Sequence, residues 1–157
     1  MVDLVIEELS KANQHEAAAL IRAGLTERWG DLDPNLNSDL DNMTETYSTG
    51  LTILVRGNEG QLIGTGTLTP RPSSTAEIVR MSVAPAARGQ GVGRMMVEEL
   101  LATARDWGCE RIVLETTSSW TDAVEFYQRC GFVLTHHGPD EFGPQTFFES
   151  RLSSPTN

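Results

Sequence analysis

The sequence has little of several residue types that mark particular classes of protein. Lysine occurs once, at Lys11, so the chain cannot form the Gly-x-x-x-x-Gly-Lys-[Ser/Thr] loop that binds ATP. Cysteine occurs twice, and Cys109 and Cys130 lack the spacing of metal ligands. We therefore expect two reduced thiols, no disulfide framework and no metal site.

Long apolar runs and an excess of positive charge are also missing. Apolar stretches are only a few residues long and residues 1–8 contain no basic side chain, so we expect no membrane span, no signal peptide and a cytoplasmic protein. The formal net charge of −10 would repel nucleic-acid phosphates. This charge either favours cationic small molecules or serves solubility alone. The acids clustered in residues 31–45 are expected to form a solvated loop face.

The chain has 157 residues and no linker rich in proline and glycine. We expect one domain over residues 1–152, long enough to bury a substantial core, and a flexible tail at 153–157.

Hydrophobic periodicity and turn residues predict alternating strands and helices. Strands are expected at 2–9, 51–56, 61–69, 75–83, 111–116, 132–136 and 145–152, and helices at 10–28, 40–47, 92–107 and 120–129. Ser10 is expected to cap the first helix, and Ser119-x-x-Asp122 to form a capping box for the last. Because a long helix separates strand 75–83 from strand 111–116, these two should be parallel neighbours.

A glycine-rich loop between strand 75–83 and the next helix is the most informative segment. Glycines at 89, 91 and 93 lack the Cβ atoms that would block close backbone approach. Their N–H groups can converge at the positive end of the helix, where a pyrophosphate would fit.

The spacing of this loop separates two remaining chemistries. A dinucleotide-binding Gly-x-Gly-x-x-Gly fingerprint is broken, because its third place falls on Arg94 or Met96. The pattern [Arg/Gln]-x-x-Gly-x-[Gly/Ala] is complete, with Arg88, Gly91 and Gly93. This pattern resembles the acyl-CoA pyrophosphate loop of the GNAT superfamily of N-acyltransferases.

A second segment strengthens this resemblance. Residues 123–132, Ala-Val-Glu-Phe-Tyr-Gln-Arg-Cys-Gly-Phe, are similar to the other GNAT hallmark, Ala-x-x-[Leu/Phe]-Tyr-x-x-x-Gly-Phe. The resemblance covers roughly residues 2–152. It implies an α/β fold with a central mixed sheet of about seven strands flanked by about four helices, and acetyl-CoA as cosubstrate.

The resemblance also assigns contacts to the cosubstrate. The backbone of Met81, Ser82 and Val83 would hydrogen-bond the pantetheine amides, as an added strand does. The pyrophosphate would be held by the loop residues Arg88, Gly89, Gln90, Gly91, Val92, Gly93 and Arg94, although Arg94 fits equally well as a solvated helix residue. Trp120 stands where many members have an asparagine that contacts pantetheine. It therefore covers the cofactor, shapes the acceptor pocket or packs on the sheet.

The implied reaction transfers an acetyl group to an amine. Tyr127 stands where many members place the tyrosine that donates a proton to the CoA sulfur, and a phenol with a pKa of about 10 is protonated at neutral pH. The alternative is a core aromatic. Glu77 matches an acid that some members use as a base, here through water, and is otherwise a solvated strand residue. His136 and His137 are less favoured as the base, because strand-end histidines are mostly surface groups.

Three functions remain in competition. The first is an N-acetyltransferase acting on a small cationic amine or a protein amine, which the sequence does not identify. The second is a non-catalytic acyl-CoA-binding or sensor module, and the third is a nucleotide-binding protein that uses the same glycines. Many members of the family dimerise, so the resemblance also implies a homodimer as one expected state.

Overall fold

The computed structural model describes residues 4–33, 35–140 and 143–152. Within these residues the elements are β1 (Val5–Glu8), α1 (Gln14–Trp29), the 3-10 helix η1 (Ser38–Asp41), α2 (Met43–Thr46), β2 (Leu51–Arg56), β3 (Leu62–Arg71), β4 (Thr75–Val83), the 3-10 helix η2 (Pro85–Ala87), α3 (Val92–Asp106), β5 (Arg111–Thr117), α4 (Thr121–Arg129), β6 (Val133–Asp140) and β7 (Gly143–Arg151). The predicted order of elements is confirmed, and β2 and β4 have the predicted bounds. The tail predicted at 153–157 lies outside the described residues.

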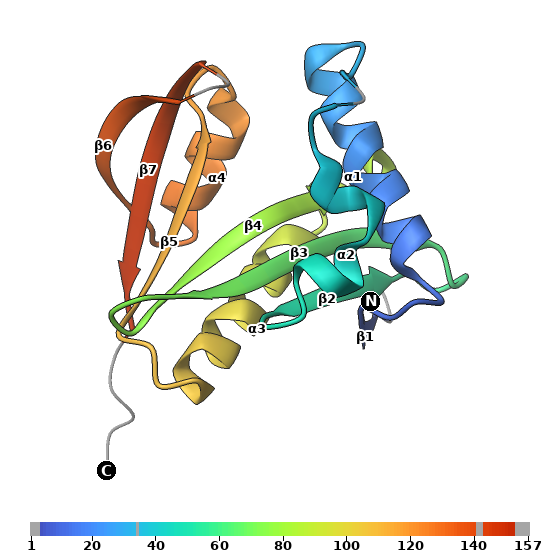
Figure 1. The fold of residues 1–157 in the computed structure, drawn as a ribbon, viewed down its shortest axis with the longest axis horizontal. Helices are drawn as coiled ribbons and strands as arrows, with labels where there is room; N and C mark the ends of the chain where they lie inside the picture. The colour runs from blue at the N-terminus through green and yellow to red at the C-terminus, as the bar shows by residue number, and fades with distance from the viewer. Residues whose placement is uncertain (1–3, 34, 141–142, 153–157) are drawn as a thin grey trace. The chain divides into compact units, whose positions relative to one another are not determined.

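The strands form a mixed sheet with the order β1-β2-β3-β4-β5-β7-β6. The predicted parallel pair is confirmed, because β4 and β5 pair from Thr75↔Arg111 to Glu77↔Val113. β7 is antiparallel to both β5 and β6 and lies between them, as Figure 1 shows. In the described part of the chain, seven strands and four α-helices thus give the predicted mixed α/β fold.

The chain divides into two compact units, each with its own contacts. The first unit comprises Met1–Thr69 and Val79–Met96, and the second comprises Pro70–Ile78 and Val97–Asn157. β4 and α3 each contribute residues to both units. That residues 1–152 act as one domain stays a prediction.

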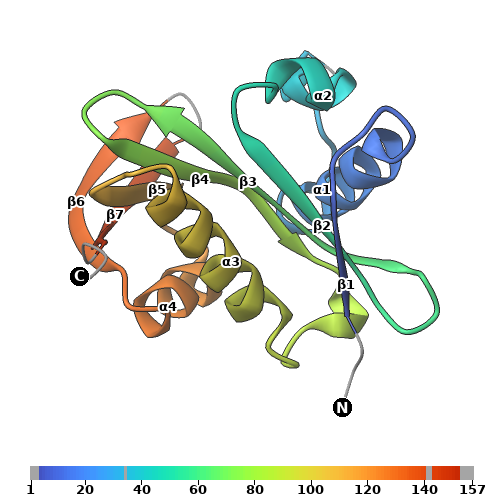
Figure 2. The ribbon, with the colours of Figure 1, turned by 90° about the horizontal axis from the view of Figure 1, so that it is seen from below.

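In the first unit, α1 and the first residues of α3 lie on opposite faces of the strands (Figure 2). One face carries a buried cluster from α1, η1, α2 and β2, formed by Ala17, Ala18, Ile21, Leu40, Met43 and Leu54. Met43 and Leu54 are fully buried, and burial of a side chain of this size stabilises the fold by about 1.5–3 kcal/mol. On the other face, a Cβ added to Gly64 of β3 would lie 2.9 Å from Met96 Sδ, so α3 begins in close contact with the sheet.

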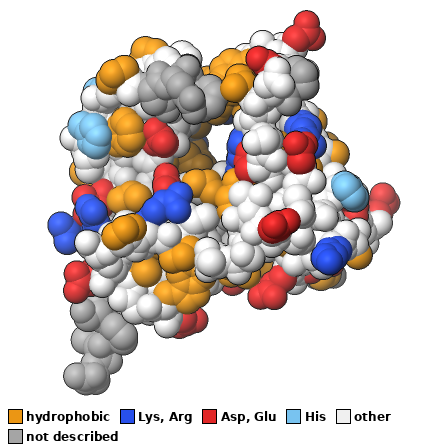
Figure 3. All heavy atoms as spheres, in the orientation of Figure 1, with side chains coloured by type: hydrophobic (Ala, Val, Ile, Leu, Met, Phe, Trp, Pro, Cys, Tyr) orange, Lys and Arg blue, Asp and Glu red, His pale blue; other side chains and the backbone are white. Residues whose placement is uncertain are grey.

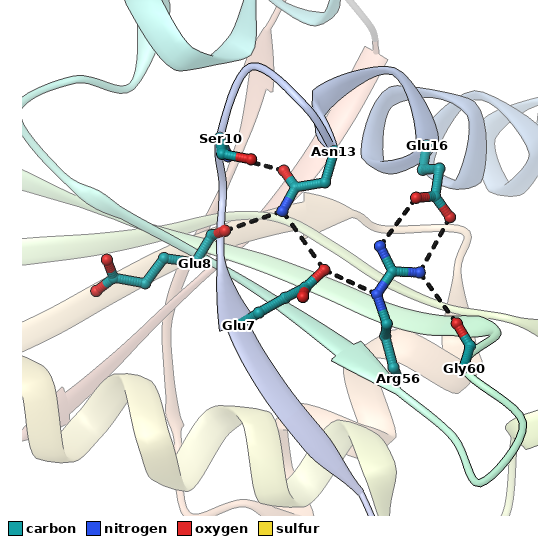
Figure 4. Close-up of polar contacts among 7 residues, drawn as sticks. All are labelled: Glu7, Glu8, Ser10, Asn13, Glu16, Arg56 and Gly60. Carbon is teal, nitrogen blue, oxygen red and sulfur yellow. Dashed lines mark hydrogen bonds and ion pairs between the residues drawn. The ribbon is translucent and has the colours of Figure 1, made fainter.

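A polar network around Arg56 joins β1, α1 and the β2–β3 turn (Figure 4). Arg56 Nε donates to Glu7 at 2.8 Å, its Nη2 donates to Glu16 at 2.9 Å, and its Nη1 donates to the Gly60 carbonyl at 3.1 Å. The hydrogen bonds to Glu16 and Glu7 raise the pKa of Arg56. The network fixes the start of α1 against the edge of the sheet.

The prediction that Ser10 caps the first helix is wrong. α1 begins at Gln14 with Asn13 as the N-cap. Ser10 instead starts a turn, in which its backbone N–H donates to Asn13 Oδ1 at 2.7 Å (Figure 4). The Asn13 amide donates to the Glu8 carbonyl at 3.0 Å, so this side chain serves the turn before the helix.

Gly50 is a position where the fold demands glycine. A Cβ there would overlap the backbone carbonyl oxygen of Leu68 and lie 3.3 Å from Thr69 Cα. Because these are backbone atoms in a sheet, they cannot move aside as a side-chain tip can. We expect Gly50→Ala to lower the free energy of unfolding by about 2–3 kcal/mol in urea denaturation.

Gly57→Ala is the matched control. Its Cβ would meet Gln61 Nε2 at 2.7 Å, which is the end of a flexible side chain. We expect a loss below about 1 kcal/mol. Equal losses in the two variants would contradict the role assigned to the Leu68 backbone.

The second unit is built on the antiparallel strands β5, β7 and β6. Ile112 and Leu114 alternate along β5 and are buried, as is Phe148 opposite Leu114 on β7. In α3, Leu100 and Ala104 lie one turn apart and are fully buried. This pattern follows from the two-residue period of strands and the 3.6-residue period of helices.

The capping box predicted at Ser119-x-x-Asp122 is wrong. α4 has Trp120 as its N-cap in place of Ser119, and the Trp120 side chain makes no capping hydrogen bond. A backbone hydrogen bond instead orders the segment before α4: Trp120 N–H donates to the Thr117 carbonyl at 3.0 Å. The helix therefore begins one residue later than a Ser119 cap requires.

Candidate functional site

The predicted site residues belong to two different units. The glycine loop and residues 81–83 lie in the first unit, whereas Glu77, Trp120 and Tyr127 lie in the second. Each group has its own local geometry.

The glycine loop has the backbone geometry of an anion site. Gly89 and Gly91 have φ angles of 77° and 83°, in the left-handed region that other residues rarely adopt. A Cβ added to either would have no heavy atom within 4 Å, so the backbone conformation and not internal packing demands glycine. Here two left-handed residues flank a residue with an ordinary backbone angle. This arrangement directs successive N–H groups toward one point.

The start of α3 supplies further N–H donors. Met95 N–H donates to the Gly91 carbonyl at 3.0 Å, so Val92, Gly93 and Arg94 form the first helical turn. Backbone N–H groups of a first turn have no acceptor within the helix, and the helix dipole is positive there. The Val92 side chain is buried, which anchors this turn to the core while its backbone stays part of the loop.

Arg88 has a partner that the sequence did not predict. Its Nη1 and Nη2 donate to the two carboxylate oxygens of Glu27 on α1 at 2.7 and 2.9 Å, and its Nε donates to the Val83 carbonyl at 3.2 Å. Both side chains are 47% exposed, so the pair stabilises the fold by at most about 1 kcal/mol. Because Glu27 balances the charge of Arg88, anion binding by this loop would depend mainly on backbone N–H groups.

The three β4 residues predicted to bind pantetheine follow an unusual backbone angle. Arg80 has a φ of 55°, in the left-handed region, within a strand. Beyond it, α1 approaches β4 closely, because a Cβ added to Gly24 would lie 3.1 Å from Ser82 Oγ. Met81, Ser82 and Val83 are all half-buried. Their contact with a ligand stays a prediction.

Arg80 is held by a polar cluster from the segment between α1 and β2. Its Nη2 and Nε donate to Asp39 Oδ1 and Oδ2 at 2.6 and 2.8 Å, and Nη2 also donates to Asn37 Oδ1 at 3.0 Å. The Tyr47 hydroxyl donates to Asp39 Oδ2 at 2.5 Å. The only sequence signal for this cluster was an arginine inside an apolar strand, which needs a partner when buried.

The cluster shifts the pKa values of its members. Burial alone would raise the pKa of Asp39, but hydrogen bonds from Arg80 and Tyr47 outweigh burial and hold that pKa below its ordinary value. Burial and the hydrogen bond to Asp39 together raise the pKa of Tyr47 to about 12. Both shifts favour a neutral tyrosine that donates to an ionised aspartate.

These shifts predict a late tyrosine titration. An unfolded tyrosine ionises near pH 10, so Tyr47 contributes stability that is fully present below about pH 10 and is lost as the pH rises through its folded pKa. We expect phenolate absorbance to show one group titrating at about pH 12, which disappears in Tyr47→Phe. In Asp39→Asn the same group should titrate closer to pH 10. An unchanged titration in Asp39→Asn would contradict the assigned cause.

Tyr127 is part of an aromatic cluster in the second unit. Its ring makes edge contacts with Phe126 and Phe132 at centroid distances of 5.1 and 5.9 Å and a tilted contact with Phe148 at 6.1 Å. The side chain is 8% exposed. The ring is therefore packed in the core of the second unit, and the role of its hydroxyl stays a prediction.

Glu77 is ion-paired within the second unit. Arg71 Nε donates to Glu77 Oε1 at 2.8 Å, and the Glu77 side chain is 19% exposed. It lies on β4 at the last residue that pairs with β5, opposite Val113. Ligand sites in α/β sheets commonly lie beyond the carboxyl ends of parallel strands, so this position is compatible with a base that acts through water.

The other candidates in the second unit have structural contacts. Trp120 is half-buried at the start of α4. The His136 ring stacks on Phe147 at 4.3 Å, and His137 Nδ1 is hydrogen-bonded to Thr146 Oγ1 at 3.0 Å. Both histidines thus have partners on β7.

The acids of residues 31–45 are partly neutralised by the chain itself. Asp39 pairs with Arg80, and Asp41 pairs with Arg22 at 2.8 Å. On the face shown in Figure 3, acidic side chains lie scattered among basic, hydrophobic and neutral ones. That face does not single out one acidic patch for a cationic acceptor.

Two other features concern residues 4–33, 35–140 and 143–152. None of the helices there is long and apolar enough to cross a membrane. The same residues contain no group of three His, Cys, Asp or Glu side chains arranged to hold a metal ion. Cys109 and Cys130 are free cysteines.

Comparisons with known proteins agree with this geometry. A family model described as the Acetyltransferase (GNAT) family matches residues 15–132. The uncharacterized N-acetyltransferase YjgM of Escherichia coli strain K12 is 33% identical over 104 residues, which cover 64% of this chain and 60% of that protein. The match thus spans less than two thirds of this relative's length.

Two solved structures share the fold. A GNAT-family acetyltransferase from Staphylococcus aureus Mu50 superposes with a TM-score of 0.85 at 20% identity, over 96% of this chain and 100% of that chain. Spermidine N-acetyltransferase from Vibrio cholerae, in complex with CoA and spermine, superposes with a TM-score of 0.76 at 18% identity, over 95% of each chain. At these identities the likeness establishes the fold.

Proposed function

The chain belongs to the GNAT family of acetyltransferases, and we propose that residues 1–152 act as one domain that transfers an acetyl group from acetyl-CoA to an amine. The observation that carries this proposal is the loop with left-handed Gly89 and Gly91 at the start of α3. It supplies backbone N–H groups at a positive helix end, which suits the pyrophosphate of CoA. That a similar fold has been solved with CoA supports the same ligand.

The cosubstrate would be held mostly by the backbone. N–H groups from Arg88 to Arg94 would bind the pyrophosphate, with Gly91 allowing close approach. The peptide groups of residues 81–83 would bind the pantetheine amides in the manner of an added strand. Trp120, at the start of α4, would cover the pantetheine in place of an amide side chain.

The reaction needs a base and an acid. Glu77 would first take a proton from the acceptor ammonium through a water molecule, which leaves a neutral amine. The amine nitrogen attacks the thioester carbonyl carbon, the C–N bond forms and the C–S bond breaks. Tyr127 would donate a proton to the departing CoA thiolate, and the second proton that the nitrogen loses as the amide forms would restore the phenol. The products are the N-acetylated amine and CoA with a free thiol.

The acceptor is proposed as a small-molecule or peptide amine. The spermidine enzyme shows that an amine substrate occurs on this fold. We place the reaction in the cytoplasm, because that compartment supplies CoA thioesters and keeps thiols such as Cys109 and Cys130 reduced.

The test is release of CoA thiol from acetyl-CoA across a panel of polyamines, aminoglycosides, amino acids and short peptides with free N-termini. Release that depends on one class of amine would establish the enzyme and name its acceptor class. Stoichiometric CoA binding without transfer to any amine would favour a non-catalytic acyl-CoA-binding module. Light scattering on the same preparation would show whether the chain forms the homodimer that the family resemblance implies.

A further inference from the structure

Arg80 holds a backbone conformation that its residue type disfavours. Its φ of 55° lies in the left-handed region, inside the strand β4. For a residue with a long side chain this conformation costs free energy, and it persists only when neighbouring groups hold it. Contacts of Arg80 with neighbouring groups must therefore offset the free-energy cost of this conformation.

The compensating contacts all come from one segment. Asp39 accepts two hydrogen bonds from the guanidinium, at 2.6 and 2.8 Å, which is the planar two-point geometry that arginine forms with a carboxylate. Asn37 accepts a third at 3.0 Å, and Tyr47 donates to Asp39 at 2.5 Å. We call Arg80, Asp39, Asn37 and Tyr47 the Arg80 clamp.

Burial makes these contacts stronger than an ordinary surface ion pair. The side chains of Arg80 and Asp39 are 21% and 20% exposed, whereas those of the neighbouring pair Arg22 and Asp41 are 41% and 70% exposed. Solvent therefore screens the clamp less than the neighbouring pair. Asn37 is itself left-handed, with a φ of 63°, so both sides of the clamp have an unusual backbone angle.

The place of the clamp in the chain points to its purpose. Arg80 immediately precedes Met81, Ser82 and Val83, whose peptide groups are proposed to bind pantetheine. A single left-handed residue in a strand re-aims the peptide groups that follow it, as a β-bulge does. If residue 80 relaxed to an extended conformation, the N–H and C=O groups of these three residues would point elsewhere.

We propose that the Arg80 clamp is a positioning device that sets the direction of the peptide groups of residues 81–83 for acyl-CoA binding, an inference that rests on the proposed function. The clamp residues are positioning residues, with no assigned part in the chemistry. They act through the β4 backbone. The Asp39 carboxylate is hydrogen-bonded to Arg80, so it holds the backbone in place and does not attract a cationic acceptor.

The test compares Asp39→Asn with Asp41→Asn. The two changes are chemically identical, but only the first breaks the clamp. Affinity for CoA is measured by calorimetry, and KM for acetyl-CoA and for the amine are measured separately. We expect Asp39→Asn to weaken CoA binding about tenfold and to raise KM for acetyl-CoA in parallel, with little change in KM for the amine. Asp41→Asn should leave all three values unchanged.

Two further measurements keep the proposal falsifiable if stability changes. Arg80→Lys keeps the charge but loses the two-point geometry, and it should weaken CoA binding as Asp39→Asn does. In the protein without ligand, the backbone coupling constant of Arg80 and the amide shifts of residues 81–83 should change in Asp39→Asn and not in Asp41→Asn.

The outcomes distinguish a failure of the clamp proposal from a failure of the proposed function. CoA binding by the unchanged chain together with unaltered binding by a folded Asp39→Asn variant would overturn the clamp and leave the proposed function standing. Equal losses of amine and acetyl-CoA affinity would show a general structural role and also overturn it. Absence of CoA binding by the unchanged chain would overturn both proposals.

Discussion

Replacing Tyr127 with phenylalanine is expected to lower kcat about 100-fold while leaving the affinity for CoA almost unchanged. The hydroxyl is proposed to protonate the departing thiolate, an interaction made only as the C–S bond breaks. Its loss should therefore reduce kcat and kcat/KM together. Steady-state turnover assays with saturating amine would measure the change.

The geometry of Tyr127 makes this substitution informative. The ring contacts Phe126, Phe132 and Phe148 at centroid distances between 5.1 and 6.1 Å, and a phenylalanine ring would keep these contacts. The melting temperature should accordingly change little. A large loss of kcat without a loss of stability would separate the chemistry of the hydroxyl from the packing of the ring.

Phe132→Leu is the matched control for packing. It removes one ring from the same cluster and leaves the Tyr127 hydroxyl in place, so it should lower stability by about 1 kcal/mol and leave kcat nearly intact. If Phe132→Leu loses as much turnover as Tyr127→Phe, or if Tyr127→Phe retains full turnover, the assignment of Tyr127 as general acid is wrong.

The strands and the long helix could be predicted from the sequence because their patterns are local. Alternation and turn residues marked β2 and β4 at their observed bounds, and glycine at Gly108 marked the end of α3. The loop was predictable for the same reason, because its glycine spacing is a local pattern, and Gly89 and Gly91 have the left-handed backbone angles that favour glycine.

The helix caps could not be predicted, because several residues near each helix start suit the position. The polar partners could not be predicted, because they lie in distant segments of the chain. Ser10 and Asn13 both suit a helix cap, and the contacts of Asn13 with β1 decided between them. Glu27 and Arg88 are 61 residues apart, and Asp39 and Arg80 are 41 apart. No spacing rule connects such pairs, although a charged residue in an apolar strand signals that a partner exists.

Gly91→Val is expected to weaken CoA binding by at least about tenfold. Gly91 has a φ of 83°, where a β-branched side chain is strongly disfavoured. An added Cβ would have no heavy atom of the chain within 4 Å, so the backbone angle is the main conflict. The loop would instead move toward an allowed conformation, and its N–H groups would no longer converge. Calorimetry with CoA, and KM for acetyl-CoA, would measure the loss.

Gly108→Val provides the matched control, because it imposes the same backbone conflict away from the loop. Gly108 has a φ of 79° and equally open surroundings, and it ends α3 with bonds from Gly108 N–H to Arg105 and from Cys109 N–H to Ala104. The variant should lose about 1–2 kcal/mol of stability and keep its CoA affinity. Because both variants carry the same strain, a loss of CoA affinity confined to Gly91→Val would locate pyrophosphate binding in the loop, whereas equal losses would reduce the effect to general destabilisation.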